Sequence, residues 1–324
     1  DRAIKTIKAA KNAGVDAVKI QTYTPETMTI DSNNSDFLIK KGLWKGRSLY
    51  NLYQEAYTPY EWHDRLFNYA KELDITLFST PFDETAVDLL EKLNTPLYKV
   101  ASFELVDLPL IRYIATKNKP IIMSTGMANL QEIGIAVETA RSGGCDKIAL
   151  LHCVSGYPAS IKESNLSLIA SLRKEFNIPI GLSDHTKGNT ASIAATALGA
   201  SFIEKHFTLS RSDGGVDSEF SLEPNEMKNL VNGCKDAFSA LGDGTFTRTR
   251  SETDNKIFRR SLYFVEDIKA GEMILPNQIR RIRPGFGISP RFYENVIGRR
   301  VTKNVSRGDR VVEDVIEVDL NKKD

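Results

Sequence analysis

Short apolar segments alternate with amphipathic segments of helical period from the first residue to about residue 240, and this alternation leaves few folds open to the chain. The apolar segments are rich in Val, Ile and Leu and lack the strict polar alternation of half-exposed strands. Such runs are typical of parallel strands that are buried on both faces. The predicted strands cover residues 17–21, 76–80, 98–102, 120–125, 147–154, 178–184 and 201–208.

This pattern predicts an α/β protein with a (β/α)8 TIM barrel, a fold that usually takes about 250 residues. The sequence opens inside a helix that ends at Gly14, and such a helix in an α/β domain normally follows a strand. We therefore expect that an eighth strand precedes Asp1 and that the natural chain extends further toward its N-terminus. The alternative is an open doubly wound sheet, which is disfavoured because no G-x-G-x-x-G motif follows a strand.

The pattern changes after the barrel. Residues 242–255 are mostly Gly, Asp, Thr, Arg and Ser, which is typical of a linker. Beyond it the helical period largely stops, and segments 261–268 and 311–318 have the character of strands. The chain is therefore predicted to have three parts: a barrel domain over residues 1–245, a linker over 246–258, and a small β-rich domain over 259–324.

Composition excludes several classes of protein. Hydrophobic residues make up 41% and charged residues 26%, the balance of a globular chain. Lys plus Arg total 43 and Asp plus Glu 42, so the basic excess of a nucleic-acid binder is missing. No apolar run approaches the roughly 20 residues needed to span a bilayer. The three cysteines are too few and too scattered for a disulfide framework, so we expect a cytoplasmic protein without a nucleic-acid or membrane partner.

Polar side chains gather where the predicted strands end, which is where a barrel of this kind carries its reacting residues. Lys19 and Lys99 stand within apolar strands, where a charge is costly unless it faces a ligand or a counterion. Together with the neighbouring hydroxyls they suit a phosphate and a carboxylate; the alternative is that each lysine pairs with a nearby Asp or Glu. The strand-end set comprises Lys19, Gln21, Thr80, Lys99, Ser102, Ser124, Tyr157, Ser183, Asp184, His185, Glu204 and His206.

Two of the four histidines follow adjacent predicted strands. His185 ends one strand and His206 lies 21 residues later, near the end of the next, so the two rings can meet. Two neutral imidazoles with water suit an open divalent-metal site, and nitrogen ligands favour Mn²⁺ over Mg²⁺. The alternative, a hydrogen-bonded core histidine, is our interpretation of His152, and we expect His63 to be a surface or packing residue.

Two loops are candidates for ligand contact. Segment 24–57 separates the first predicted strand from its helix, and loops of this length in compact barrels are usually lids or binding loops. Its aromatic residues, Trp44 among them, either contact a ligand or pack the loop onto the barrel. Segment 214–217 contains glycines that permit close backbone approach, and Asp217 can hydrogen-bond sugar hydroxyls, although a plain surface turn is an equal alternative.

The chain contains six motifs, VKIQ (18–21), FSTPFD (78–83), YKVAS (98–102), STGM (124–127), GLSDHT (181–186) and EKHFT (204–208). Together these motifs resemble the sialic acid synthase family, and the resemblance covers nearly the whole chain. The C-terminal part resembles the family's antifreeze-like (SAF) domain, most clearly at RIRPGFG (281–287). Segments 27–32, 42–53 and 207–211 are most similar to the pseudaminic acid synthase branch, whereas His152 is more similar to the sialic acid branch.

The resemblance implies an enzyme that condenses phosphoenolpyruvate with an open-chain N-acetylated aminosugar, giving a nine-carbon 2-keto acid and phosphate. In the pseudaminic branch the sugar is 2,4-diacetamido-2,4,6-trideoxy-L-altrose. The alternatives within the family are an N-acetylneuraminate or a legionaminate synthase, which use N-acetylmannosamine or a diacetamido analogue.

The resemblance also implies a role for each site residue. Glu104 would lie beside the reacting groups, and Arg283 would come from the partner subunit of a domain-swapped homodimer. His185 and His206 would bind Mn²⁺ or Mg²⁺. The implied phosphoenolpyruvate contacts are Lys19, Thr80, Lys99, Ser102, Ser124 and Ser183. The implied sugar contacts are Gln21, Tyr157 and Asp217.

Two features depart from the family pattern. The family's first strand carries a catalytic glutamate and this sequence begins after that strand, so we expect the glutamate in the N-terminal extension. Ser155 stands where sialic acid members typically have Asn shortly before the tyrosine, here Tyr157, and it fits a different sugar.

Two other classes of protein remain open. A metal-dependent barrel hydrolase typically needs three or more ligands and often a His-x-His pair, which this sequence lacks. A carbohydrate-binding or antifreeze module led by the small domain would leave the strand-end lysines and serines without a purpose.

Overall fold

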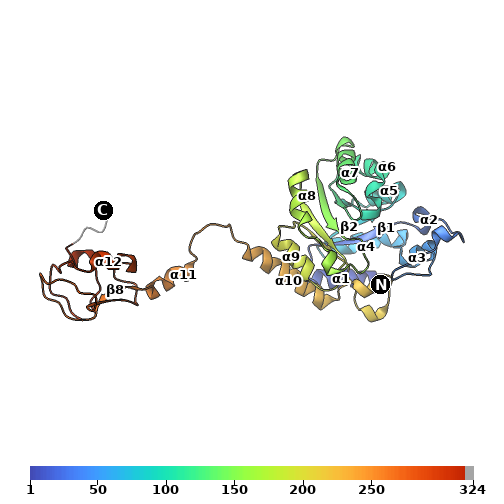
Figure 1. The fold of residues 1–324 in the computed structure, drawn as a ribbon. Helices are drawn as coiled ribbons and strands as arrows, with labels where there is room; N and C mark the ends of the chain where they lie inside the picture. Colours follow the sequence, from blue (N-terminus) through green and yellow to red (C-terminus); the bar gives the residue numbers. More distant parts are fainter. Residues whose placement is uncertain (318–324) are drawn as a thin grey trace. The chain divides into compact units, whose positions relative to one another are not determined.

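The computed structural model describes residues 1–317 and divides into two compact units, residues 1–243 and residues from 244 onward. The first unit is built on a seven-stranded parallel sheet (Figure 1). Its strands follow chain order and each pairs with the next, so the predicted succession of parallel strands is confirmed. The strands are β1 Ala17–Thr22, β2 Thr76–Pro81, β3 Tyr98–Val100, β4 Ile121–Ser124, β5 Ile148–Cys153, β6 Ile180–Asp184 and β7 Ile203–Lys205.

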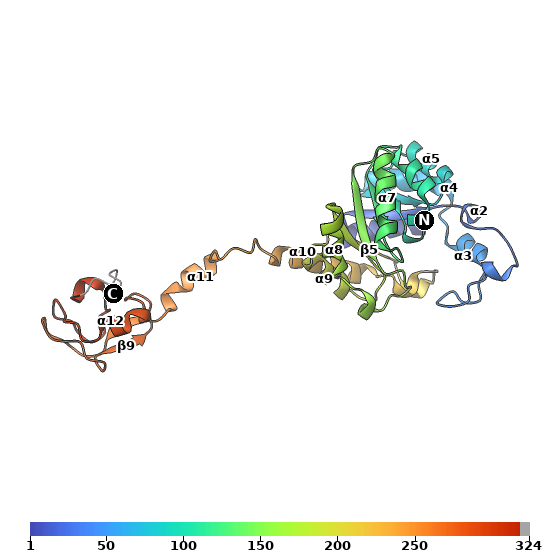
Figure 2. The same cartoon turned by 45° about the horizontal axis from the view of Figure 1, so that its top comes forward.

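Helices connect successive strands and cover the outside of the curved sheet (Figure 2). Several begin or end at residues that satisfy the free backbone groups of a helix terminus. Gly14 ends the first helix in the left-handed conformation with φ 88°, and the Asp83 side chain accepts from the backbone N–H groups of Thr85 and Ala86. The helices are α1 Arg2–Ala13, α2 Pro25–Met28, α3 Leu49–Ala56, α4 Tyr60–Glu72, α5 Glu84–Lys92, α6 Leu108–Ala115, α7 Leu130–Ser142, α8 Leu168–Phe176, α9 Thr190–Ala197 and α10 Pro224–Ala240.

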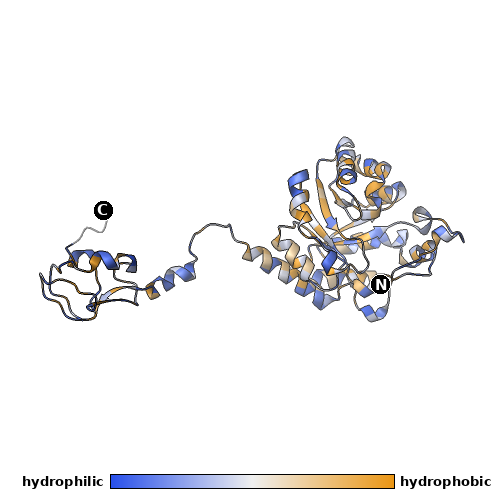
Figure 3. Cartoon of the chain, viewed as in Figure 1, coloured by the Kyte–Doolittle hydropathy of each residue, from blue (hydrophilic) through white to orange (hydrophobic). Residues whose placement is uncertain are grey.

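The core of this unit lies between the sheet and the helices outside it. Leu90, Ile111 and Ile121 are fully buried there, and the strands are largely apolar (Figure 3). Within residues 1–317, β1 and β7 are the two edges of the sheet, and the strand expected before Asp1 stays a prediction. None of the helices in these residues is long and apolar enough to cross a membrane.

Register places the polar strand ends next to one another. Gln21 on β1 is the partner of Thr80 on β2, and Ser183 on β6 is the partner of Glu204 on β7. Because all the strands are parallel, their carboxyl ends meet at one rim of the sheet. The candidate site is therefore assembled by pairing between strands that are far apart in sequence.

The second unit has its own small core around an antiparallel pair, β8 Ser261–Phe264 and β9 Ile279–Ile282. Its helices are α11 Arg250–Asp254 and α12 Tyr293–Val296. The predicted strand at 261–268 ends at Phe264, and β9 was not predicted from the sequence.

One sequence-based expectation for this part of the chain was wrong. The strand expected at 311–318 is replaced by a 3-10 turn at Glu313–Val315, with Val318 outside the described residues. The polar segment predicted to be a linker contains α11, which begins with a capping box formed by Thr249 and Glu252.

Candidate active site

Lys99, on β3, is almost completely buried, with 1% of its surface exposed. Its Nζ donates hydrogen bonds to Ser124 Oγ at 2.6 Å and to the Val100 carbonyl at 2.8 Å. Both partners are neutral, so burial prevails: it lowers the pKa of Lys99 to about 8, despite the attraction of Glu204. A buried ammonium group whose hydrogen-bond partners are neutral is strongly stabilised by an anionic ligand.

Glu204 lies among the cations, a role that the sequence analysis did not give it. Its Oε1 accepts from Ser183 Oγ at 3.1 Å and lies 3.9 Å from Lys19 Nζ. Burial alone would raise the pKa of Glu204, but Lys19, Lys99 and His206 together hold it at about 2. Glu204 is therefore ionised and partly balances the lysine pair, so the alternative that a lysine pairs with a nearby carboxylate holds for Lys19.

Buried hydroxyls surround the lysines. Thr80 Oγ1 lies 3.5 Å from Lys19 Nζ, and Ser102 Oγ accepts from the Gly126 N–H at 3.1 Å. A Cβ atom at Gly126 would lie 2.1 Å from Ser155 Oγ and 2.8 Å from Ser102 Oγ, so any larger residue here would displace these hydroxyls. The four strand-end hydroxyls implied as phosphoenolpyruvate contacts are all buried: Thr80, Ser102, Ser124 and Ser183.

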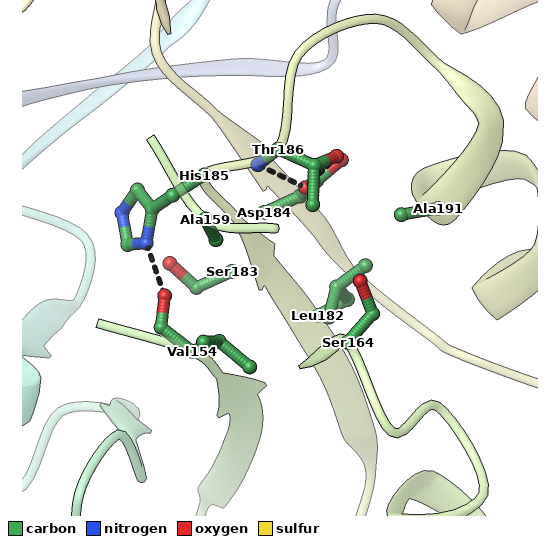
Figure 4. A pocket seen from close by; sticks show the side chains of 9 residues that line it. All are labelled: Val154, Ala159, Ser164, Leu182, Ser183, Asp184, His185, Thr186 and Ala191. Atoms are coloured by element: carbon green, nitrogen blue, oxygen red, sulfur yellow. Dashed lines mark hydrogen bonds between the residues drawn. The ribbon is translucent and has the colours of Figure 1, made fainter. Parts of the chain in front are cut away.

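His185 and His206 lie together, with ring centroids 5.3 Å apart. The His185 Nδ1–H donates to the Val154 carbonyl at 3.1 Å (Figure 4), and His206 Nδ1 lies 3.4 Å from Asp217 Oδ2. These contacts fix the two rings and leave the Nε2 atoms available, as outer hydrogen bonds do in metal sites. No group of three or more His, Cys, Asp and Glu within residues 1–317 is placed to hold a metal, so the two imidazoles would leave other coordination positions to water and substrate.

An aromatic wall adjoins the imidazoles. The Tyr157 ring lies 4.5 Å from His185, and the Phe220 ring lies 4.9 Å from His206. Trp44, from the long loop, lies 5.7 Å from Tyr157. Burial raises the pKa of the Tyr157 hydroxyl, which therefore stays protonated.

Glu104 lies in the short 3-10 helix η2, Ser102–Val106, which follows β3. Its Oε2 is buried and has no hydrogen-bond partner in the described part of the chain. Burial raises the pKa of Glu104 to about 7, although Lys99 lowers it. A buried carboxyl oxygen without a partner, with a pKa near neutrality, marks a group available to a ligand.

The remaining predicted residues are placed as follows. Gln21 is half-buried on β1, and Arg283 is exposed in the second unit after β9. His63 is buried, and its Nε2 accepts from Thr22 at 2.8 Å. His152 is also buried and donates to the Ser164 carbonyl at 2.7 Å, so both are hydrogen-bonded core histidines.

The fold and this rim define a parallel β/α protein that can hold a compact anion beside a pair of imidazoles. The chain belongs to the NeuB family, which residues 6–246 match, and residues 259–316 match the SAF domain. The sequence-based resemblance to this family is confirmed.

Relatives with known names are similar over most of the chain. The chain is 44% identical to the pseudaminic acid synthase of Campylobacter jejuni, over 95% of this chain and 90% of that protein. It is 43% identical to the pseudaminic acid synthase of Helicobacter pylori, over 98% of this chain and 94% of that protein. A solved structure of the sialic acid synthetase from Leptospira borgpetersenii, in complex with citrate, aligns with a TM-score of 0.70 at 31% identity, covering 78% of this chain and 84% of that one.

Proposed function

We propose that this chain condenses phosphoenolpyruvate with 2,4-diacetamido-2,4,6-trideoxy-L-altrose to give pseudaminic acid and phosphate. The observation that carries the proposal is the buried lysine and hydroxyl cluster around Lys99, set beside two imidazoles in a NeuB-family barrel. Similarity to pseudaminic acid synthases supports the choice of sugar. The two free, buried cysteines Cys145 and Cys153 fit a reducing compartment such as the cytoplasm.

Phosphoenolpyruvate carries a phosphate and a carboxylate, and the cluster supplies cations and donors for both. Lys19 and Lys99 orient the two anionic groups, and Ser102, Ser124 and Ser183 contribute hydroxyls, with Thr80 beside Lys19. The gain comes from proximity and orientation rather than from proton transfer by the lysines. Before phosphoenolpyruvate binds, the negative charge of Glu204 partly compensates the positive charges of Lys19 and Lys99.

The two imidazoles fit a divalent ion because each has its Nδ1 occupied by an outer partner and its Nε2 available. We propose Mn²⁺ or Mg²⁺ on His185 and His206. Lewis acidity toward the aldehyde oxygen of the sugar is the chemistry that such an ion supplies when bound. Gln21, Tyr157 and Asp217 would orient the sugar around it.

The reaction forms a bond from carbon 3 of phosphoenolpyruvate to the aldehyde carbon of the sugar. Water then adds at carbon 2 and releases one proton, which balances the proton that the aldehyde oxygen gains. The resulting tetrahedral intermediate loses hydrogen phosphate by C–O cleavage as its new hydroxyl becomes the keto oxygen. The aldehyde oxygen must gain a proton to become a hydroxyl. Glu104, whose pKa is about 7, holds a proton part of the time near neutrality and can supply it.

We also propose that the protein works as a domain-swapped homodimer, in which the SAF domain of one subunit supplies Arg283 to the sugar site of its partner. The exposure of Arg283 fits a residue that acts outside its own unit. A guanidinium group suits an acetamido or hydroxyl oxygen of the sugar.

Phosphate release measured with several sugars tests the reaction. We expect kcat/KM for the diacetamido-altrose to exceed that for N-acetylmannosamine by about 100-fold or more, because a site built for two acetamido groups leaves its polar groups unpaired with a sugar that has one. A higher value for another sugar would reassign the chain to the N-acetylneuraminate or legionaminate branch. Phosphate release that needs no sugar would indicate a hydrolase, and none with any sugar would indicate a binding module.

The pH dependence tests the role of Lys99. Protonated Lys99 is needed to hold the anion, so we expect the KM for phosphoenolpyruvate to be flat up to about pH 8 and to rise above it. Because the charge of Glu204 favours protonation of Lys99, Glu204→Gln should move this limb to lower pH by at least about half a unit. A limb that stays in place in Glu204→Gln would contradict the assignment.

A further inference from the structure

The long loop between β1 and α4 has an ordered tip. Leu38 and Ser48 form an antiparallel bridge. The Ile39 N–H donates to the Arg47 carbonyl at 2.9 Å, and the Gly46 N–H donates to the Ile39 carbonyl at 2.8 Å. These bonds hold the tip, residues 38–48, together as one ordered unit, which we call the lid.

Trp44 connects the lid to two loops that are distant in sequence. Its indole Nε1–H donates to the Val216 carbonyl at 2.8 Å, across 172 residues of sequence. Its ring lies 5.7 Å from the ring of Tyr157 at an angle of 42°. An indole offers both an apolar face and a single donor, and both are used here.

Each contacted loop supports one of the two imidazoles. Tyr157 packs on His185 with ring centroids 4.5 Å apart. Val216 directly precedes Asp217, whose carboxylate lies 3.4 Å from His206 Nδ1. Trp44 thus contacts Tyr157, which packs on His185, and Val216, the residue next to the Asp217 partner of His206.

The loop before Asp217 contains two glycines, so the hydrogen bond from Trp44 can restrict its conformation. Gly214 and Gly215 adopt φ of 75° and 127°, so this segment is built from residues with wide conformational freedom. A hydrogen bond that fixes the next residue restricts that freedom and holds Asp217 in place.

We propose that Trp44 is a positioning residue that latches the lid over the sugar side of the site and, through Val216 and Tyr157, sets the orientation of Asp217 and of the imidazoles. The functional part of this inference rests on the proposed function, whereas the latch itself does not. Trp44 acts through its neighbours, so its loss should weaken sugar binding and leave the phosphoenolpyruvate cluster intact.

Hydrogen exchange in the absence of substrate tests the latch. Trp44→Phe keeps a ring against Tyr157 but removes the N–H donor, and Trp62→Phe changes the other tryptophan, which is half exposed on α4, as a matched control. We expect amides of the lid and of residues 214–217 to exchange about tenfold faster in Trp44→Phe than in the wild type or the control. Equal exchange in all three proteins would overturn the latch.

Steady-state kinetics test the functional consequence. For Trp44→Phe we expect the KM for the aminosugar to rise about five- to tenfold, with the KM for phosphoenolpyruvate changed less than twofold, and for Trp44→Ala a larger rise in the same parameter. Equal rises in both KM values would show a merely structural role and contradict the proposal. If the wild type released no phosphate with any sugar, the proposed function would fail, and the exchange experiment would still decide the latch.

Discussion

Alanine at His185 or at His206 is expected to lower the rate of phosphate release by about 1000-fold or more, because each change removes one of the two protein nitrogens available to a divalent ion. The remaining imidazole would hold the ion more weakly, and the aldehyde would lose electrophilic activation. The rate is measured with saturating phosphoenolpyruvate and sugar in the presence of Mn²⁺.

Direct titration with Mn²⁺ provides a readout that does not depend on turnover. Both variants should bind the ion at least about tenfold more weakly than the wild type. Thermal unfolding is the control for folding, since His185 is buried and its Nδ1–H donates to the Val154 carbonyl. Full turnover of either variant after exhaustive chelation would disprove the metal assignment.

Arg283→Ala and Lys99→Met are each expected to be nearly inactive, yet a mixture of the two should recover activity. Lys99→Met removes the buried ammonium while keeping most of its volume, and Arg283→Ala changes an exposed side chain, so neither should prevent folding. If Arg283 acts in the partner's site, a mixed dimer contains one site with both groups intact.

With complete subunit exchange at equal concentrations, half of the dimers are mixed and each has one intact site of two, so recovery should reach about a quarter of wild-type activity. Phosphate release before and after exchange gives the recovery, and differently tagged subunits show that exchange has occurred. If tagged mixed dimers form and the mixture stays inactive, Arg283 does not act across subunits.

Much of the first unit could be predicted because its local patterns agree with its tertiary structure. Strands buried on both faces need continuous apolar runs, and the helices that cover them need one apolar face, so both periods are written in the sequence. Less of the second unit could be predicted from the sequence. Strand β9, with its sequence IRRI, has three exposed residues of four and no apolar run to reveal it.

The candidate site was predicted as a set of residue types, and its electrostatics were not. Lys19 and Lys99 stood out because a charge within an apolar strand requires a reason. Glu204 was not identified as a counterion from the sequence. Its effect on the lysine charges depends on its position 3.9 Å from Lys19 and next to Ser183, which only strand pairing brings about. The contact of Trp44 with Val216 likewise joins residues that no local pattern relates.

The sequence by itself determined the order of the parallel strands, the residues at their carboxyl ends and the family, because these follow from the period of apolar residues and from motifs of a few consecutive residues. Only the tertiary structure decided which charged and neutral groups surround each of those residues. It places Lys99 against neutral partners, leaves one oxygen of Glu104 without a partner, and surrounds Glu204 with cations. The physical reason is that burial and charge act through space over a few ångströms, so a pKa is fixed by neighbours that the fold brings together from distant parts of the chain.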